Sequence, residues 1–103
     1  MAKAPRLTGV ASLGMGWYRP EDWDRLLQVI ADRDSMHDTY AEWLASARQG
    51  ERDLVARGQP VERVMVDPDE LASWCLIRGL VPDGAARAEF VSDRMRLAAR
   101  RRL

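Results

Sequence analysis

The chain has 103 residues, a formal net charge of zero and a hydrophobic content of 47%. This length predicts one domain with a modest core, and the apolar content excludes an intrinsically disordered chain. No stretch approaches the roughly 20 apolar residues of a membrane-spanning helix, so we expect no membrane partner.

The first sixteen residues carry two basic side chains ahead of a weakly apolar run. Glycines interrupt this run and no good small-residue cleavage site follows, so we expect folded structure here and not a signal peptide. Residues 6–13, RLTGVASL, combine β-branched and apolar residues and predict a short strand. Gly14 and Gly16 then predict a bend.

Residues 20–32 predict a helix. Pro20 suits its first position, where a missing N–H costs nothing, and the acidic residues that follow suit the positive end of the helix dipole. Apolar residues then recur from Trp23 to Ile30 with the spacing of one buried stripe. A polar break over residues 33–38 ends the pattern.

Residues 39–57 predict a second helix, which pairs with the first as a helical hairpin. Thr39 and Glu42 form a capping box, and Gly58 is placed to end the helix in the left-handed conformation. Trp23 and Trp43 lie on the apolar stripes of this hairpin, so we expect both in the core.

Residues 61–67 form a nearly continuous apolar run that predicts a second strand covered on both sides. Helices over residues 68–78 and 84–102 follow as a second hairpin, the first of them capped by Asp67 and ended by Gly79. The order βααβαα predicts an α+β fold, mostly helical, with two helical hairpins and a small two-stranded sheet. Because two strands alone are marginal, we expect helices or a second copy of the chain to complete the sheet.

Four residues are candidates for a ligand pocket or an active site: Trp17, Tyr18, His37 and Asp38. Trp17 and Tyr18 precede the first helix and lie on no apolar stripe, while Asp38 could orient the His37 imidazole and raise its pKa. The alternatives are an aromatic lid over the hairpin and a solvated loop histidine. No serine or cysteine lies in a nucleophile motif, so we favour a protein without catalytic activity.

We expect no metal and no cofactor. The single cysteine, Cys75, has no partner at C-x-x-C spacing and lies in an apolar helix, which favours a buried, inert thiol. It also excludes an intramolecular disulfide and favours a reducing, cytoplasmic location. The acids of DPDE, residues 67–70, are accounted for by helix capping and lack the spacing of a calcium loop.

Positive charge is concentrated at the C-terminal end. The last ten residues contain five arginines and no acid, whereas residues 20–42 carry a net charge of −5. This asymmetry predicts either an anion or nucleic-acid contact, or a helix end that pairs with the acidic hairpin of the same or another subunit. No aromatic residue is interleaved for base stacking. The five arginines are Arg94, Arg96, Arg100, Arg101 and Arg102.

The stretches WYRPEDWDRL, TYAEWL and VDPDELASWC, with the GL–D–AR–EF pattern after them, resemble short uncharacterised bacterial proteins over residues 17–90. The resemblance implies a compact, standalone bacterial cytoplasmic protein and brings no activity, cofactor or site residue. From the residues themselves we expect protein–protein association, with a homodimer as the first hypothesis. Nucleic-acid binding through the arginine-rich helix and a ligand site at Trp17, Tyr18 and His37 are the alternatives.

Overall fold

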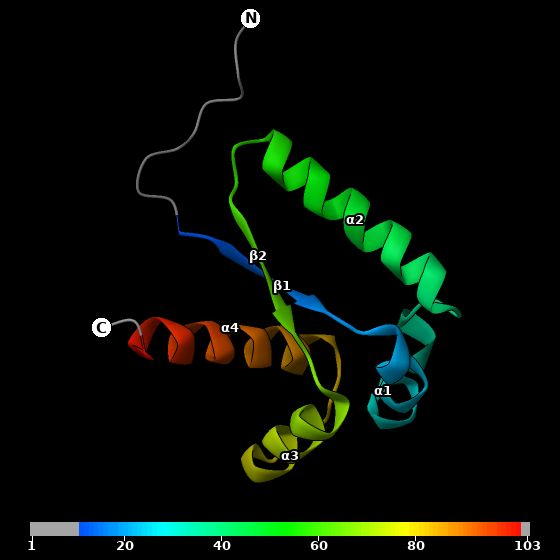
Figure 1. Ribbon diagram of the computed structural model, residues 1–103. Helices are drawn as coiled ribbons and strands as arrows, with labels where there is room; N and C mark the ends of the chain where they lie inside the picture. The colour runs from blue at the N-terminus through cyan, green and yellow to red at the C-terminus, as the bar shows by residue number, and fades with distance from the viewer. Residues whose placement is uncertain (1–10, 102–103) are drawn as a thin grey trace, which may run out of the picture.

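A computed structural model describes residues 11–101 and shows an α+β fold that is mostly helical (Figure 1). The elements follow the predicted order βααβαα, with short 3-10 turns ahead of α1 and α2. They are β1 (Leu13–Trp17), η1 (Pro20–Asp22), α1 (Trp23–Val29), η2 (Arg33–Ser35), α2 (Tyr40–Ala56), β2 (Val61–Met65), α3 (Pro68–Arg78) and α4 (Gly84–Arg101).

β1 and β2 form a two-stranded parallel sheet in which Leu13 lies opposite Val61 and Trp17 lies opposite Met65. Parallel neighbours cannot be joined by a tight turn, and here the crossover contains both α1 and α2. The sheet therefore joins the N-terminal residues of the described chain to its second half.

Different helices cover the two faces of the sheet, with α2 on one side and α4 on the other (Figure 1). Met15 points toward α2, where its Cε would lie 3.5 Å from a Cβ placed on Gly50. Arg63 of β2 donates a hydrogen bond to Glu51 of α2 at 2.7 Å and stacks its guanidinium 3.8 Å from the Trp17 ring. These contacts hold α2 against the sheet.

The strand predicted at residues 6–13 lies instead at Leu13–Trp17, where a bend was expected. Residues 6–10 lie outside the described residues, and the two residues that follow them are not part of a strand. Gly14 and Gly16 were interpreted as turn residues. In the structure they let α4 pack directly against β1, because a side chain at either position would meet α4.

β2 ends at Met65, two residues earlier than predicted, because the chain turns into α3. Val66 is buried with 1% of its surface exposed, and Asp67 becomes the cap of the helix. Val64 packs on the core, whereas Met65 is 51% exposed. The prediction of a strand covered on both sides is therefore only partly met, since two helices are too few to cover the whole sheet.

The helix predicted over residues 20–32 is shorter and begins with η1. Pro20 stands at the first position as predicted, but α1 itself runs only from Trp23 to Val29. Ile30 is extended, with φ −72° and ψ 147°, and is 7% exposed. The chain leaves the helix there and turns the Ile30 side chain into the core.

Side-chain caps begin the other helices, and the caps of α2 and α3 were predicted. Thr39 and Glu42 make the capping box of α2, with both side-chain to backbone hydrogen bonds at 3.2 Å. Asp67 accepts two backbone N–H groups at the start of α3, and Asp83 accepts one at the start of α4. Gly79 ends α3 with φ 67°, the left-handed conformation that glycine adopts readily.

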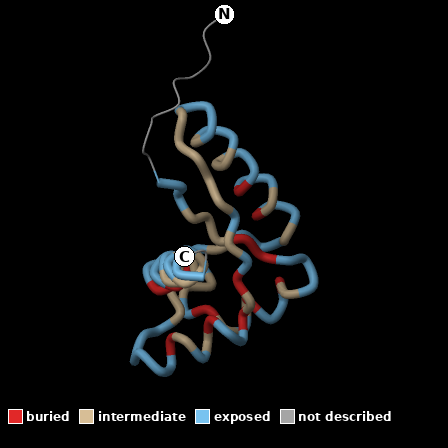
Figure 2. The backbone as a smooth tube through the Cα atoms, turned by 60° about the vertical axis from the view of Figure 1, so that its left-hand side comes forward, coloured by how far each residue is buried: buried red, intermediate tan, exposed pale blue. Residues whose placement is uncertain are grey.

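The core has two connected parts, visible as buried segments in Figure 2. In the first part, interacting aromatic rings have centroids 4.9 to 6.3 Å apart, and we call this group the aromatic cluster: Trp17, Tyr18, Trp23, Tyr40 and Trp43. Trp23 and Trp43 are 5% and 8% exposed, which confirms the prediction that both lie in the core. The second part contains side chains from α1, α3, α4 and the end of β2: Leu26, Val66, Leu71, Cys75, Ala86 and Phe90.

Replacing Gly14 by alanine should destabilise the fold by about 1–3 kcal/mol, the usual cost of overpacking. The added Cβ would collide with Met95 Sδ and lie 2.8 Å from Val91 Cγ1. Gly50→Ala is the matched control, because its Cβ would make ordinary contact with Met15 and alanine should stabilise the helix by about 0.5–1 kcal/mol. Urea denaturation measures the free energy of unfolding of both variants. Wild-type stability in Gly14→Ala would show that α4 does not need a glycine to approach β1.

Candidate functional site

The four residues predicted to line a ligand pocket fall into two environments. Trp17 and Tyr18 are 6% and 7% exposed and belong to the aromatic cluster. His37 and Asp38 are exposed on the connection between η2 and α2, where Asp38 accepts a 3.5 Å hydrogen bond from Arg33. Tyr18 lines a groove beside β1, and neither His37 nor Asp38 lines that groove. The two pairs therefore differ in burial, and only the aromatic pair reaches the core.

The five arginines predicted to contact an anion also divide. Arg94 and Arg96 form ion pairs with carboxylates of α3 and α4 at 2.8 and 3.3 Å. Arg100 and Arg101 are exposed on the last turn of α4, where positive charge suits the negative end of the helix dipole. Arg102 lies outside the described residues. The uncompensated positive charge on α4 is therefore smaller than the sequence implies.

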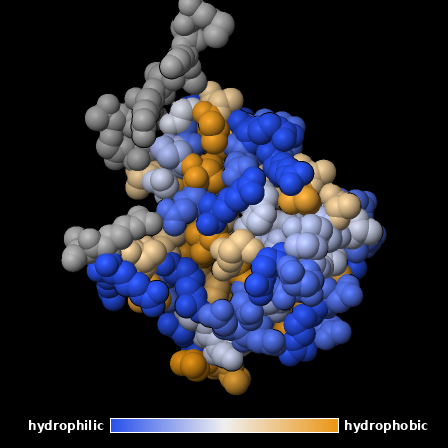
Figure 3. Space-filling view, viewed as in Figure 1, coloured by the Kyte–Doolittle hydropathy of each residue, from blue (hydrophilic) through white to orange (hydrophobic). Residues whose placement is uncertain are grey.

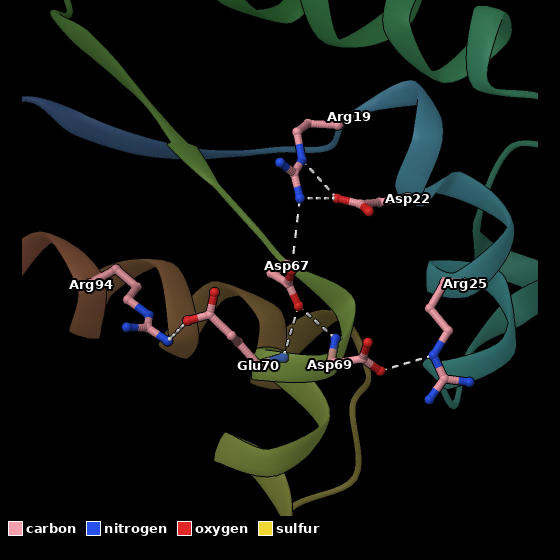
Figure 4. Close-up of polar contacts among 7 residues, drawn as sticks. All are labelled: Arg19, Asp22, Arg25, Asp67, Asp69, Glu70 and Arg94. Atoms are coloured by element: carbon pink, nitrogen blue, oxygen red, sulfur yellow. Dashed lines mark hydrogen bonds and ion pairs between the residues drawn. The ribbon is translucent and has the colours of Figure 1, made fainter.

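An ion-pair network surrounds the start of α3 (Figure 4). Arg25 of α1 lies 2.9 Å from Asp69, and Arg94 of α4 lies 2.8 Å from Glu70, while Asp67 caps the helix. Such exposed pairs contribute about 0–1 kcal/mol each, so they orient α1 and α4 around α3 more than they stabilise the fold. Among residues 11–101, no group of three or more His, Cys, Asp or Glu side chains could hold a metal ion.

Asp32 and Arg87 form a partly buried ion pair that sequence reasoning missed. Arg87 Nη1 lies 2.6 Å from Asp32 Oδ1, and the arginine side chain is 12% exposed. Asp32 also accepts hydrogen bonds from Ser35 Oγ at 2.7 Å and from the Gly84 N–H at 3.1 Å. The hydrogen bond from Arg87 lowers the pKa of Asp32 to about 2. The pair thus ties the α1–α2 connection to the start of α4.

A groove with a volume of about 390 Å³ lies along β1, and we call it the β1 groove. Its walls are the backbone of β1 and one side of α4, and Tyr18 and Trp43 from the aromatic cluster also line it. Burial raises the pKa of the Tyr18 hydroxyl, an effect that the positive charge of Arg87 partly opposes. The hydroxyl is therefore protonated at neutral pH, and Tyr18 offers the groove an aromatic ring and no charge.

Apolar side chains face solvent where α3 ends, and we call this group the apolar cap: Leu76, Ile77, Leu80 and Val81. Leu76 and Ile77 are each 81% exposed, and Val81 is 61% exposed. The space-filling view shows hydrophobic surface at the lower end of the molecule, where Figure 1 places α3 (Figure 3). The sequence contained a signal for this exposure. A helix that buries Leu71 and Cys75 on one face cannot also bury both Leu76 and Ile77, because these residues point away from that face.

Trp74 connects the apolar cap to α4. It lies between two surface hollows of about 490 and 440 Å³, both of which it lines together with Arg78. Its indole Nε1 donates to Asp93 at 3.1 Å, the Arg78 guanidinium stacks 4.2 Å from its ring, and Phe90 meets it edge-on at 5.6 Å. These contacts hold the Trp74 side chain in one orientation beside the apolar cap.

Comparison with known proteins assigns no activity to this geometry. No family model matches the chain, and neither the curated proteins nor the solved structures contain a match. None of the helices in the described part of the chain is both long and apolar enough to span a bilayer. Function must therefore be inferred from the chemistry of the β1 groove and the apolar cap.

Acidification should weaken the fold as Asp32 takes up a proton. Its folded-state pKa of about 2 lies below the ordinary value of 3.8, so the stabilisation is complete above pH 3.8 and is lost as the pH falls through about 2. We expect this loss to be at most about 2 kcal/mol. Urea denaturation at several acidic pH values measures it. Asp32→Asn should be less stable at neutral pH and lack this component, so an unchanged pH dependence in the variant would contradict the assignment.

Proposed function

We propose that this protein acts by protein–protein association and forms a homodimer through the apolar cap. The observation that carries the proposal is the exposure of Leu76 and Ile77, each 81% accessible to solvent. Large apolar side chains scattered singly on a surface are ordinary, but a group of them is characteristic of interaction sites. Leu80 and Val81 follow Ile77 after two intervening residues, at the turn that ends α3, and add two more exposed apolar side chains to the group.

A second copy of the chain is the partner that we propose for this surface. In a two-fold symmetric interface each side chain contributes twice, and one cap would meet the other. Two caps remove four side chains per copy from water, at about 1.5–3 kcal/mol for each one fully buried. Leu80 and Val81 are already partly buried, so the gain is smaller than four full burials per copy, but it is of the same order as the roughly 4–15 kcal/mol that association costs. Arg78 lines the same surface hollow as Ile77 and supplies a charge beside the cap.

The turn that presents the cap is rigid, which favours binding. Gly79 takes the left-handed conformation, and the Leu80 N–H donates to the Cys75 carbonyl at 2.9 Å, the hydrogen-bond pattern of a Schellman motif. Trp74 and its contacts support the cap from the side of α4. A preformed surface loses little conformational entropy when it binds.

A cytoplasmic location is part of the proposal. Cys75 is the only cysteine and is 1% exposed, and burial raises the pKa of its thiol. Such a thiol is protonated and shielded, so it forms neither a disulfide nor an easily reached nucleophile. These properties suit a reducing compartment.

Replacing Ile77 by glutamate should convert the dimer to a monomer, because a charge in the centre of an apolar interface is costly to desolvate. Sedimentation velocity at micromolar concentration measures the change. Val55→Glu is the matched control, since Val55 is an exposed apolar residue of α2, 56% accessible, outside the cap. It should remain dimeric. A monomeric wild-type protein, or a dimer that survives in Ile77→Glu and in Leu76→Glu, would overturn the proposal.

A further inference from the structure

β1 has a strand neighbour on one side only, because the sheet of residues 11–101 contains two strands. Two hydrogen bonds show which residues face that neighbour. The Leu13 N–H donates to the residue before β2 at 2.8 Å, and the Trp17 carbonyl accepts from the residue after β2 at 2.9 Å. Alternate residues of a strand direct their backbone groups to opposite edges. Gly14 and Gly16 therefore direct two N–H and two C=O groups away from β2.

The β1 groove lies against both of these glycines. Gly14 and Gly16 are half-buried and line the groove, together with Ala88 and Ser92 on the facing side of α4. Among the described residues, no backbone hydrogen bond outside the sheet reaches either glycine. Backbone groups in partly buried positions normally find partners. This edge is suited to an occupant that carries donors and acceptors at the spacing of a polypeptide backbone.

We infer that the β1 groove binds an extended segment of a partner polypeptide, which joins the sheet as a third strand beside β1. Peptide addition at a strand edge obtains affinity from main-chain hydrogen bonds and specificity from alternate side chains. In the antiparallel orientation, the two peptide residues opposite Gly14 and Gly16 each exchange both backbone hydrogen bonds with their glycine. All four backbone groups at this edge are then satisfied.

The lining of the groove specifies the side chains of the segment. Directly opposed residues of paired strands place their side chains on the same face of the sheet. The peptide residues opposite Gly14 and Gly16 therefore face α4, where Ala88 and Ser92 leave room for small side chains. The residue between them faces the other way, toward the side of the sheet on which Trp43 lies, and should be apolar. The segment has the pattern small, apolar, small.

The segment should also be uncharged. Arg87 is the one charged side chain among the residues that line the groove in the described chain. Its two Nη atoms bond both carboxylate oxygens of Asp32, at 2.6 and 3.1 Å, and one of them also bonds the Pro82 carbonyl at 3.3 Å. The positive charge is thus compensated inside the protein. The groove favours a neutral backbone segment over a carboxylate or phosphate ligand.

A second copy of β1 fits this edge less well than a single segment does. Paired strands lie about 4.8 Å apart, and α4 packs directly against the β1 face at Gly14. Two copies joined through β1 would bring two α4 helices to the same side of the sheet, closer than the roughly 8–10 Å that packed helices need. A segment without its own helix avoids this conflict.

Amide hydrogen exchange on the full chain, followed by NMR, tests the edge without a ligand. Met15 and Trp17 amides should be protected by β2, while Gly14 and Gly16 amides should exchange at least about tenfold faster. Equal protection of all four amides would show that the edge is already covered and would overturn the inference. Protection of the glycine amides that rises with protein concentration would assign the edge to a second copy and would also overturn it.

A random peptide library displayed on phage and selected on the immobilised protein supplies the probe. A selected peptide should protect the Gly14 and Gly16 amides and carry the predicted side-chain pattern. Ala88→Trp, which fills the groove from an exposed position of α4, should weaken its binding at least about tenfold. Ala85→Trp is the matched control, because Ala85 is an exposed alanine of the same helix outside the groove, and it should bind normally.

Three outcomes of this selection would overturn the inference: no peptide is recovered, recovered peptides shift resonances outside the groove, or the two tryptophan variants behave alike. The measurement is repeated in Ile77→Glu, which places a charge in the apolar cap. The β1 groove and the cap are separate surfaces, so retained peptide binding in this background supports the groove even if the homodimer proposal fails.

Discussion

The close approach of α4 to β1 is the constraint on which the rest of the structure depends. A sheet of two short strands is marginal by itself, so it needs a helix on each face. Gly14 and Gly16 remove the side chains that would hold α4 away. Once α4 lies against β1, Arg87 can reach Asp32 and Phe90 enters the core, where it is 1% exposed. The same approach creates the β1 groove, because α4 forms one wall of it.

On the other face of the sheet, aromatic contacts hold α2 in place. Trp43 of α2 meets every other ring of the aromatic cluster, with centroid distances from 4.9 to 6.0 Å. Each such pair contributes about 0.5–1.5 kcal/mol beyond its buried area. The Tyr40 hydroxyl donates to the Tyr18 carbonyl at 2.9 Å, whereas the buried Trp23 indole N–H has no partner within the described residues. The packing gain must exceed the roughly 1–3 kcal/mol that an unsatisfied buried group costs.

Local signals in the sequence predicted those features that depend on neighbouring residues. The Thr39 capping box and the Asp67 cap each involve a few consecutive positions, so the pattern alone identified them. Glycine in β1 was ambiguous, because the same residue serves turns and close helix contacts. The ion pair of Asp32 and Arg87 joins residues far apart in the chain and has no local signature.

The candidate site was harder to predict than the fold for a related reason. Periodicity separates a buried stripe from an exposed one only when apolar residues are confined to the stripe. In α3 they are not, since Leu76 and Ile77 are apolar and exposed, so the apolar cap became visible only with the orientation of the helix. The β1 groove depends on which strand edge remains open, and that is a property of the topology.

The parallel pairing of β1 and β2 also determines when the chain can become compact. Of the described elements, β1 is synthesised before its neighbour β2, which follows only after the whole of α1 and α2, and α4 comes after β2. Until then β1 has only its aromatic contacts with α1 and α2 to hold it, and closing so long a loop to β2 carries an entropic cost. A nascent chain of this protein therefore completes the sheet and its covering helices only once α4 has been synthesised.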